Sequence, residues 1–224
     1  ATPGNEEAFQ VVFNSLVAQQ QYDEALRRLH SFMRIKGNSK TLAAKELELY
    51  RLKNDHSKVN QLTKTMFLNY PNDIDLKEGF VKVISEEIKD HLAAEEWNLA
   101  ETKLRQLIPH ANAEYRDFIN NSLQNAYYQQ GKFTEALQII EEMHRVNPSD
   151  ANLAVKKASI YMRLQQYDKA VASYEALLGS LKPDQQFYYL TGFNDMMAQV
   201  VKESTEAQRY RDAMSWVTRW LAVA

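Results

Sequence analysis

The sequence lacks cysteine and contains little glycine or proline. The absence of cysteine excludes disulfides, iron–sulfur clusters, thiolate zinc sites and cysteine nucleophiles. The chain has 6 glycines and 5 prolines in 224 residues, which is well below ordinary usage and disfavours a fold built from tight β-turns. Gln, Glu, Leu, Ala and Lys fill the long intervals, and these residues favour helices. The expected fold class is all-α.

The sequence also lacks a surplus of charge and a long apolar run. It has 27 basic and 29 acidic side chains, spread evenly over both halves. Because phosphate contacts carry most of the affinity of nucleic-acid binders, no nucleic-acid partner is expected. No run of about 18 apolar residues occurs, so no membrane span is expected either. These features favour a soluble protein of the cytoplasm or periplasm, and the sequence does not choose between the two.

Two stretches in the second half of the chain repeat each other at a constant offset. The aligned pairs are Tyr127 and Tyr161, Phe133 and Tyr167, Ala136 and Ala170, Ile140 and Tyr174, and Met143 and Leu177. Within each copy the last four positions recur at the spacing of one helical face. One helical hairpin cannot bury such a face alone, so the pattern predicts stacked neighbours that share a continuous core.

The same frame extends along the whole chain. Its anchor positions, where a small or apolar residue recurs, are Ala25, Val59, Ala100, Ala136, Ala170 and Ala213. The pattern resembles the tetratricopeptide repeat (TPR), whose unit of roughly 34 residues is a helical hairpin with a small residue early in its second helix. This resemblance implies a single domain, a right-handed α-α superhelix (a TPR-like solenoid) of five to six helical hairpins. The expected hairpins are 6–39, 40–73, 74–111, 112–149 and 150–183, followed by a degenerate one at 184–224.

Two intervals between anchors are clearly longer than the others. The interval from Val59 to Ala100 exceeds the repeat unit by about seven residues, and that from Ala170 to Ala213 by about nine. Seven extra residues are nearly two α-helical turns, so a longer first helix beginning near Asp73 or Asp75 would keep its apolar face in phase. Pro183 is a suitable entry to the second long helix. We expect two long first helices; inserted loops are the alternative.

No catalytic or metal-binding constellation is evident. The histidines are scattered among different repeats, and the pair His91 and Glu95 supplies only two of the three or four ligands that zinc needs. Acidic residues that are adjacent on a helix, such as Glu141 and Glu142, diverge by about 100° and cannot act as one acid/base pair. No glycine-rich phosphate loop is present. We therefore expect no enzyme activity, no cofactor and no metal.

The resemblance implies a binding groove lined by the first helix of each hairpin, with peptides or partner helices as ligands. The candidate peptide- or partner-binding residues are Asn14, Arg51, Lys89, Asn121, Asn125, Tyr128, Ser159, Met162 and Arg163. Asparagine can donate to and accept from a peptide backbone, which suits an extended ligand; simple solvation of these side chains is the alternative. The carboxylate clamp of the family's cochaperones is not expected, because Lys45 and Glu86 stand where that clamp requires Asn and Arg.

The last hairpin is unusually rich in aromatic residues. The candidates for an apolar contact are Phe187, Tyr188, Phe193, Trp216 and Trp220. The residues between Phe187 and Met197 cannot all face one stripe of a helix. Burial between the fifth and the last hairpin is one interpretation, and contact with a partner chain, including self-association through the C-terminal hairpin, is the other.

The sequence thus favours a non-enzymatic scaffold or adaptor that binds a peptide or partner subunit in the concave groove of a TPR solenoid. The alternative is a regulatory or targeting domain of a larger enzyme or of a secretion or export assembly protein.

Overall fold

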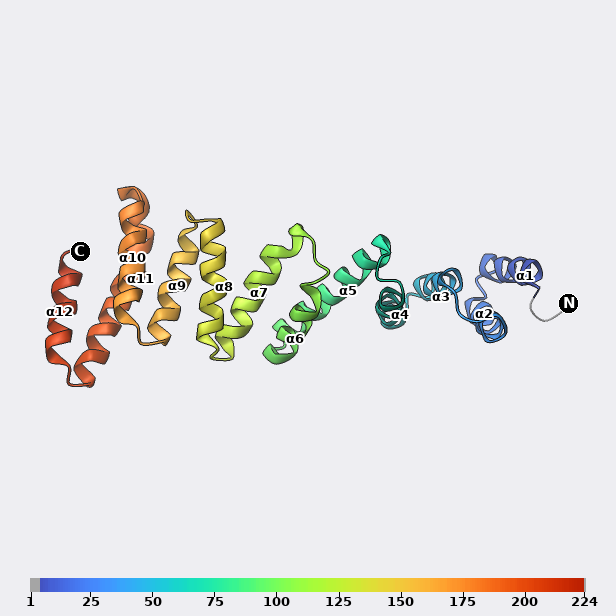
Figure 1. Ribbon diagram of the computed structural model, residues 1–224, viewed down its shortest axis with the longest axis horizontal. Helices are drawn as coiled ribbons and strands as arrows, with labels where there is room; N and C mark the ends of the chain where they lie inside the picture. The colour runs from blue at the N-terminus through green and yellow to red at the C-terminus, as the bar shows by residue number, and fades with distance from the viewer. Residues whose placement is uncertain (1–4, 224) are drawn as a thin grey trace. The chain divides into compact units, whose positions relative to one another are not determined.

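The computed structural model describes residues 5–223, and every regular element in this range is a helix. The helices, shown in Figure 1, are α1 (Glu6–Ala18), α2 (Tyr22–Lys36), α3 (Lys40–Leu52), α4 (His56–Asn69), α5 (Ile74–Ala93), α6 (Trp97–Leu107), the 3₁₀ turn η1 (Ala113–Tyr115), α7 (Arg116–Gln129), α8 (Phe133–Val146), α9 (Ala151–Arg163), α10 (Tyr167–Ser180), α11 (Pro183–Glu206) and α12 (Tyr210–Leu221). The predicted all-α class, built of helical hairpins, is confirmed.

The chain divides into two compact units. The first comprises the residues up to 93 together with 103–112, and the second comprises 94–102 and 113–224. Helix α6 is shared, because its residues up to Thr102 group with the second unit and those from Lys103 with the first. The expectation of a single solenoid domain stays a prediction.

The predicted anchors take one structural position in all six hairpins. Ala25, Ala100 and Ala170 are each the fourth residue of a second helix, as are Val59, Ala136 and Ala213. All five anchor alanines are buried. A small side chain at this point lets two helix backbones approach closely, which explains why the repeat frame is visible in the sequence.

The turns inside the hairpins also repeat. The residue two positions before each second helix has a positive φ, and these residues are Gln20, Asn54, Glu95, Gly131, Gln165 and Gln208. In this left-handed conformation the backbone amide of the residue that follows donates to the carbonyl five residues earlier in the chain. After Gln165, for example, the Gln166 amide donates to the Tyr161 carbonyl at 2.8 Å. This pattern is the usual hydrogen-bonded ending of a helix. Only one of the six residues is the glycine that this conformation favours.

Both long intervals between anchors are long first helices, as predicted. Helix α5 has 20 residues and begins at Ile74, where Asp73 accepts a hydrogen bond from the Leu76 amide at 2.9 Å. Helix α11 has 24 residues and begins at Pro183, which has no amide hydrogen to lose at this position. The alternative of inserted loops is wrong for both intervals.

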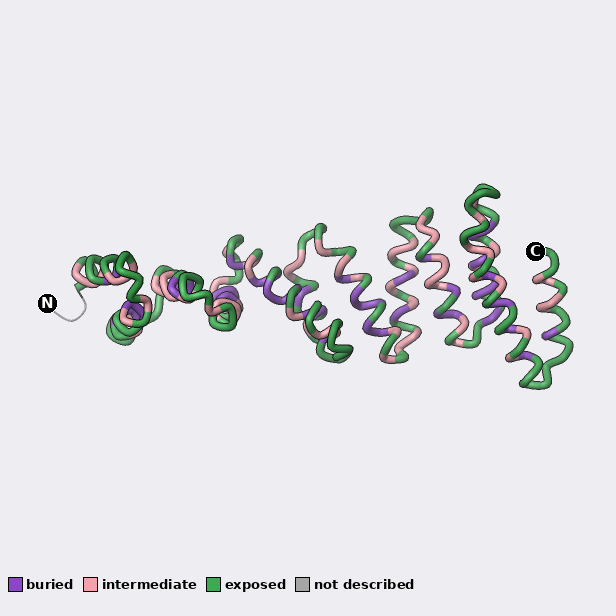
Figure 2. The backbone as a smooth tube through the Cα atoms, turned by 180° about the vertical axis from the view of Figure 1, so that it is seen from behind, coloured by how far each residue is buried: buried purple, intermediate pink, exposed green. Residues whose placement is uncertain are grey.

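The hydrophobic core of each unit lies between successive helices, where the buried segments in Figure 2 gather. In the first unit, one cluster joins Phe13 of α1 to Leu29 of α2 and Leu49 of α3. In the second unit, a larger cluster joins Tyr161 of α9, Tyr174 of α10 and residues of α11. Helix α11 contributes Phe193 and Met197, which are both fully buried. Consecutive packing of this kind leaves the first helices α7, α9 and α11 with one face each outside the core.

Candidate functional site

Two hollows lie along the first helices of the second unit. The α7–α9 hollow, of about 800 Å³, is lined by residues of α7, α8 and α9, among them Asn121, Glu142 and Val155. The α9–α11 pocket, of about 460 Å³, is lined by Tyr128, Val155, Ser159, Met162, Arg163, Gln165, Tyr174, Gly192, Asp195, Met196, Gln199 and Glu203. Val155 lines both, so they adjoin along α9. Together they form a groove over α7, α9 and α11.

Four of the predicted binding residues meet in the α9–α11 pocket: Tyr128, Ser159, Met162 and Arg163. The Arg163 Nε donates to the Tyr128 hydroxyl at 3.1 Å, and its guanidinium carbon lies 5.8 Å from the centre of the Tyr128 ring. Burial raises the pKa of Tyr128, but hydrogen bonds with Ser159 and Arg163 outweigh it and hold that pKa below its ordinary value. The aromatic ring and the guanidinium therefore fix each other's orientation at one end of the pocket.

The two predicted asparagines of α7 differ in how they are engaged. The Asn121 side-chain amide donates to the Asp117 carbonyl at 2.9 Å and accepts from Lys156 at 3.3 Å, so part of its hydrogen-bonding capacity is used within the chain. Asn125, one turn further along α7, is exposed, and its side chain makes no hydrogen bond with the described residues. Of the two, Asn125 keeps all its donors and acceptors for a ligand.

The predicted residues of the first unit lie on α1, α3 and α5, and all of them are exposed. Each has a neighbour on its own helix. Asn14 accepts from Gln10 at 2.7 Å, Arg51 lies 3.7 Å from Glu48, and Lys89 lies 2.9 Å from Glu86. Pairs of this kind on a solvated helix contribute little to stability. None of the three lines the α7–α9 hollow or the α9–α11 pocket.

The aromatic residues of the last hairpin separate into two groups. Phe187 and Tyr188 are 75% and 80% exposed, and their ring centres lie 6.3 Å apart near the start of α11. Phe193 is fully buried, which decides in favour of burial for this residue. Trp216 and Trp220 pack against the core cluster of α9–α11, and the Trp220 indole donates to Asn194 at 2.8 Å. Self-association through this hairpin stays a prediction.

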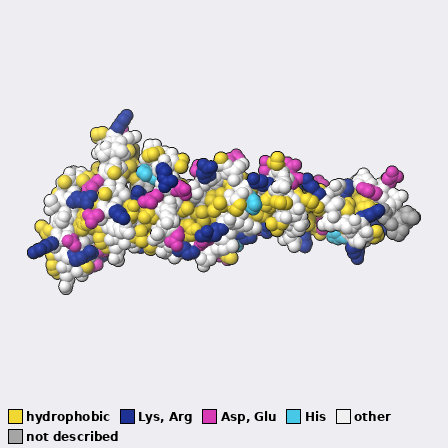
Figure 3. Space-filling view, viewed as in Figure 1, with side chains coloured by type: hydrophobic (Ala, Val, Ile, Leu, Met, Phe, Trp, Pro, Cys, Tyr) yellow, Lys and Arg dark blue, Asp and Glu magenta, His cyan; other side chains and the backbone are white. Residues whose placement is uncertain are grey.

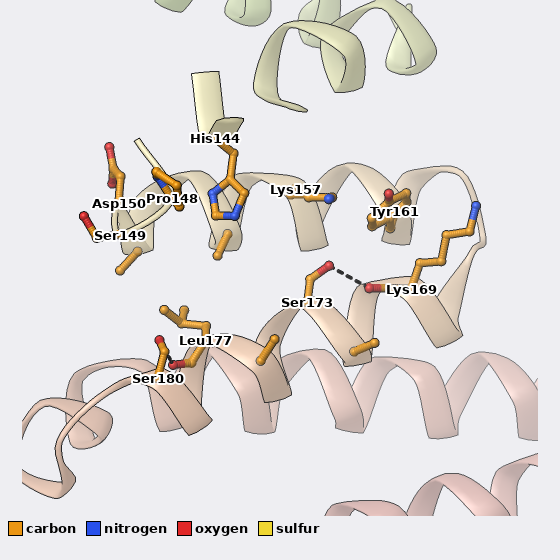
Figure 4. A pocket seen from close by; sticks show the side chains of 14 residues that line it. His144, Pro148, Ser149, Asp150, Lys157, Tyr161, Lys169, Ser173, Leu177 and Ser180 are labelled. Atoms are coloured by element: carbon orange, nitrogen blue, oxygen red, sulfur yellow. Dashed lines mark hydrogen bonds between the residues drawn. The ribbon is translucent and has the colours of Figure 1, made fainter. Parts of the chain in front are cut away.

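A further hollow of about 430 Å³ lies over α8, α9 and α10 (Figure 4). His144, Lys157 and Tyr161 line one side of it, and Ser173 and Leu177 lie across from them. The His144 Nδ1 is buried and has no hydrogen-bond partner among the described residues. None of the residues predicted from the sequence lines this hollow.

The charges of the described residues are mixed in sign. On the face shown in Figure 3, basic and acidic side chains are interspersed, and no large area carries one sign. Residues 5–223 contain no group of three or more side chains arranged to hold a metal ion. No helix in that range is both long enough and apolar enough to span a membrane.

Sequence reasoning missed the residues that α10 and α11 bring to the α9–α11 pocket. Gly192, Asp195, Met196, Gln199 and Glu203 follow one another at helical spacing along one face of α11. That spacing was the available signal, because the groove face of a first helix recurs every three or four residues. Tyr174 of α10 carried no such signal, since its position in the repeat is that of a core residue.

Comparison with known proteins identifies the repeat. Residues 127–192 match the tetratricopeptide repeat family. This range includes α8, α9 and α10 and overlaps both of the aligned copies. The predicted family resemblance is confirmed, and the match places it in this segment.

Individual relatives share less. A curated relative, the Hsp70-Hsp90 organising protein of Plasmodium falciparum (isolate 3D7), is 43% identical over 47 residues, which are 21% of this chain and 8% of the relative. The chain thus matches only a small part of that protein. Among solved structures, the P58(IPK) TPR domain is 18% identical over 88% of this chain and 56% of its own, with a TM-score of 0.45. A MamA structure is 17% identical over 79% of this chain and 93% of its own, with a TM-score of 0.46. With TM-scores below 0.5, neither structure supports a conclusion about this chain.

Proposed function

We propose that this chain is a non-enzymatic interaction scaffold whose second unit binds an extended segment of a protein partner in the groove over α7, α9 and α11. The observation that carries the proposal is the α9–α11 pocket, where residues of α7, α9 and α11 converge. Its lining combines thioethers, an aromatic ring, hydroxyls and charges of both signs. Such a mixed lining suits a peptide, whose side chains also combine apolar, polar and charged groups.

The adjoining hollows give the groove a length that suits an extended chain. Val155 connects them. Asn125 lines neither hollow, but it offers an uncommitted side-chain amide on α7 between Asn121 of the first hollow and Tyr128 of the second. An amide of this kind can pair with a peptide backbone whatever the peptide's sequence. The Arg163 Nε donates to the Tyr128 hydroxyl, and this bond holds the guanidinium in place. The two terminal nitrogens of the guanidinium are then left to bind a ligand. An acidic or carbonyl-rich stretch of the partner suits this end of the groove.

The proposal is tested with a partner identified by pull-down and mass spectrometry. Isothermal titration then compares the wild type with the double variant Asn125→Ala/Arg163→Ala. We expect the variant to lose about 2–4 kcal/mol of binding free energy, the usual effect of removing anchoring contacts. Its thermal stability should change little, because exposed substitutions seldom cost more than about 0.5 kcal/mol.

The matched control is Arg145→Ala, which removes an exposed arginine of α8 that lines neither hollow. It should bind the partner as the wild type does. Equal affinities of the wild type and the double variant would place the binding site elsewhere, with the exposed Phe187 and Tyr188 as the next surface to test.

A further inference from the structure

One wall of the α9–α11 pocket is a row of side chains on α11. Asp195 is exposed, and its carboxylate forms no hydrogen bond or ion pair with the described residues. The carboxylate of Glu203 is already engaged, because it accepts hydrogen bonds from the Tyr167 hydroxyl and from Gln199. Arg163 is engaged with Tyr128 and forms no ion pair with Asp195. Of these two carboxylates, only that of Asp195 accepts no hydrogen bond from the described residues and is left open to a ligand.

Tyr174 brings a second uncommitted polar group to the same wall. Its side chain is only 7% exposed, yet its hydroxyl makes no hydrogen bond with the described residues. The hydroxyl reaches the pocket by passing close to Gly192, where a Cβ would lie 2.6 Å from the oxygen. A glycine at this position of α11 thus makes room for the hydroxyl. The hydroxyl opens onto the pocket and has no partner within the described residues, so it can accept a hydrogen bond from a ligand.

The walls beside these two groups are apolar and adaptable. Met162 of α9 and Met196 of α11 both line the pocket, with Val155 nearby. Thioether side chains adjust readily to an aliphatic stem. Burial raises the pKa of Tyr174, and the negative charge of Asp195 adds to the effect. A ligand group with a positive charge and hydrogen-bond donors satisfies both.

We propose that the α9–α11 pocket receives a lysine or arginine side chain of the partner segment, with its aliphatic stem between Met162 and Met196 and its cation against Asp195 and the Tyr174 hydroxyl. The inference rests on the proposed groove function and names the chemistry that one part of the groove selects. Because Arg163 lines the same pocket, the proposed groove selects a segment that carries an acidic group and a basic group close together. Long basic side chains commonly bury their aliphatic stems along apolar surface while the charged end stays outside it.

The probe is a displayed library of random dodecapeptides selected on the wild-type protein. We expect the selected peptides to share a lysine or arginine at one position. Replacing that residue by alanine should weaken binding about tenfold, near the value of one partly desolvated ion pair. Asp195→Asn should weaken the basic peptide by a similar factor and change the alanine peptide less than about twofold, so that the two changes are coupled.

Further variants separate the groups involved. Tyr174→Phe keeps the ring and removes only the hydroxyl, and it should weaken the basic peptide several-fold without affecting the alanine peptide. Asp195→Lys should reverse the preference toward a peptide with glutamate at the same position. The matched control Asp184→Asn removes an exposed carboxylate of the same helix outside the pocket, and it should bind every peptide as the wild type does.

The outcomes distinguish this inference from the proposed function. Peptides that bind the wild type, lose binding to Asn125→Ala/Arg163→Ala and show no coupling to Asp195 would overturn the basic-residue pocket and leave the groove function standing. Peptides that bind the double variant as well as the wild type, or a selection that returns no groove-dependent peptide, would contradict both.

Discussion

Helices α10 and α12 occupy the same place in successive hairpins, yet only one of them is covered on both sides. Their aligned pairs are Tyr167 and Tyr210, Val171 and Met214, and Leu178 and Leu221. On α10 these side chains are 8%, 0% and 5% exposed, whereas on α12 they are 61%, 66% and 73% exposed. The same apolar pattern is therefore core in one hairpin and surface in the other.

The difference teaches what the repeat pattern encodes. Both helices bury their anchor alanine against the first helix of their own hairpin. The second apolar row of α10 is buried because α11 packs on it, and in residues 5–223 no following helix does so for α12. The side of α12 that faces α10 is nevertheless held in place by a bidentate ion pair between Arg219 and Glu175 of α10. The Arg219 Nε donates to Glu175 Oε1 at 2.7 Å, and Nη2 donates to Oε2 at 2.5 Å. Figure 2 shows α12 accordingly as mainly exposed.

The largest expected effect concerns the buried anchor alanines of the second helices. Ala170 is fully buried, so Ala170→Glu places a carboxylate where there is no room for a larger side chain. We expect a loss of unfolding free energy on the order of 3–5 kcal/mol from the buried charge and the overpacking, and the same for Ala136→Glu. Thermal melts measure this. Melting temperatures within about two degrees of the wild type would show that the repeat frame is misplaced.

The next effect tests the outer rows directly. Val171→Ala should cost about 2 kcal/mol, because it leaves a cavity between α10 and α11. The aligned change Met214→Ala should cost less than about 0.5 kcal/mol, because Met214 is 66% exposed. Denaturant unfolding of both variants under identical conditions gives the two values. Similar losses would mean that the outer row of α12 is covered in solution.

A smaller effect should depend on pH. The Tyr167 hydroxyl donates to Glu203 of α11, and this bond holds the pKa of Glu203 below its ordinary value. A lowered folded-state pKa stabilises the protein above the unfolded value of about 4.3, and the contribution is lost as the pH falls through the folded pKa. Tyr167→Phe should therefore cost at most about 1 kcal/mol at pH 7, since Glu203 is partly solvated, and almost nothing near pH 3.

The control for the pH effect is Tyr210→Phe. The Tyr210 hydroxyl forms no hydrogen bond with the described residues. Tyr210→Phe should therefore be as stable as the wild type at pH 7 and at pH 3. Urea midpoints measured at pH 7 and pH 3 provide the comparison. A pH-independent loss in Tyr167→Phe would show that the ring, and not the hydrogen bond to Glu203, is what the substitution disturbs.

The smallest effect should be the same in both hairpins. Gln165 and Gln208 hold φ values of 56° and 58° before α10 and α12. A left-handed conformation strains a side chain, and glycine relieves it at an entropic cost, so Gln165→Gly and Gln208→Gly should each stabilise by about 0.5 kcal/mol. Because the backbone geometry does not depend on what covers the helix, equal shifts in the chemical denaturation midpoint are expected. Gly131→Ala should act in the opposite direction.

The sequence located parts of the candidate site and missed others for a physical reason. Tyr128, Ser159, Met162 and Arg163 follow the repeat frame, so their common face was predictable, and the structure brings them into one pocket. The residues of α11 lie within the longer interval between Ala170 and Ala213, where the frame no longer gives the rotation of the helix. Tyr174 occupies a core position, and only the gap at Gly192 shows that its hydroxyl reaches the groove.

The sequence by itself determined the helical hairpins, their anchors and the two long helices, because these depend on local propensity and on a spacing that the hairpins share. Only the tertiary structure decided which apolar rows are buried and which polar groups meet. The outer row of α10 and that of α12 have the same pattern, and whether a neighbouring helix packs on the row decides between core and surface. Asp195 and the Tyr174 hydroxyl likewise share a pocket because α10 and α11 pack closely at Gly192, a contact that no spacing along the chain records.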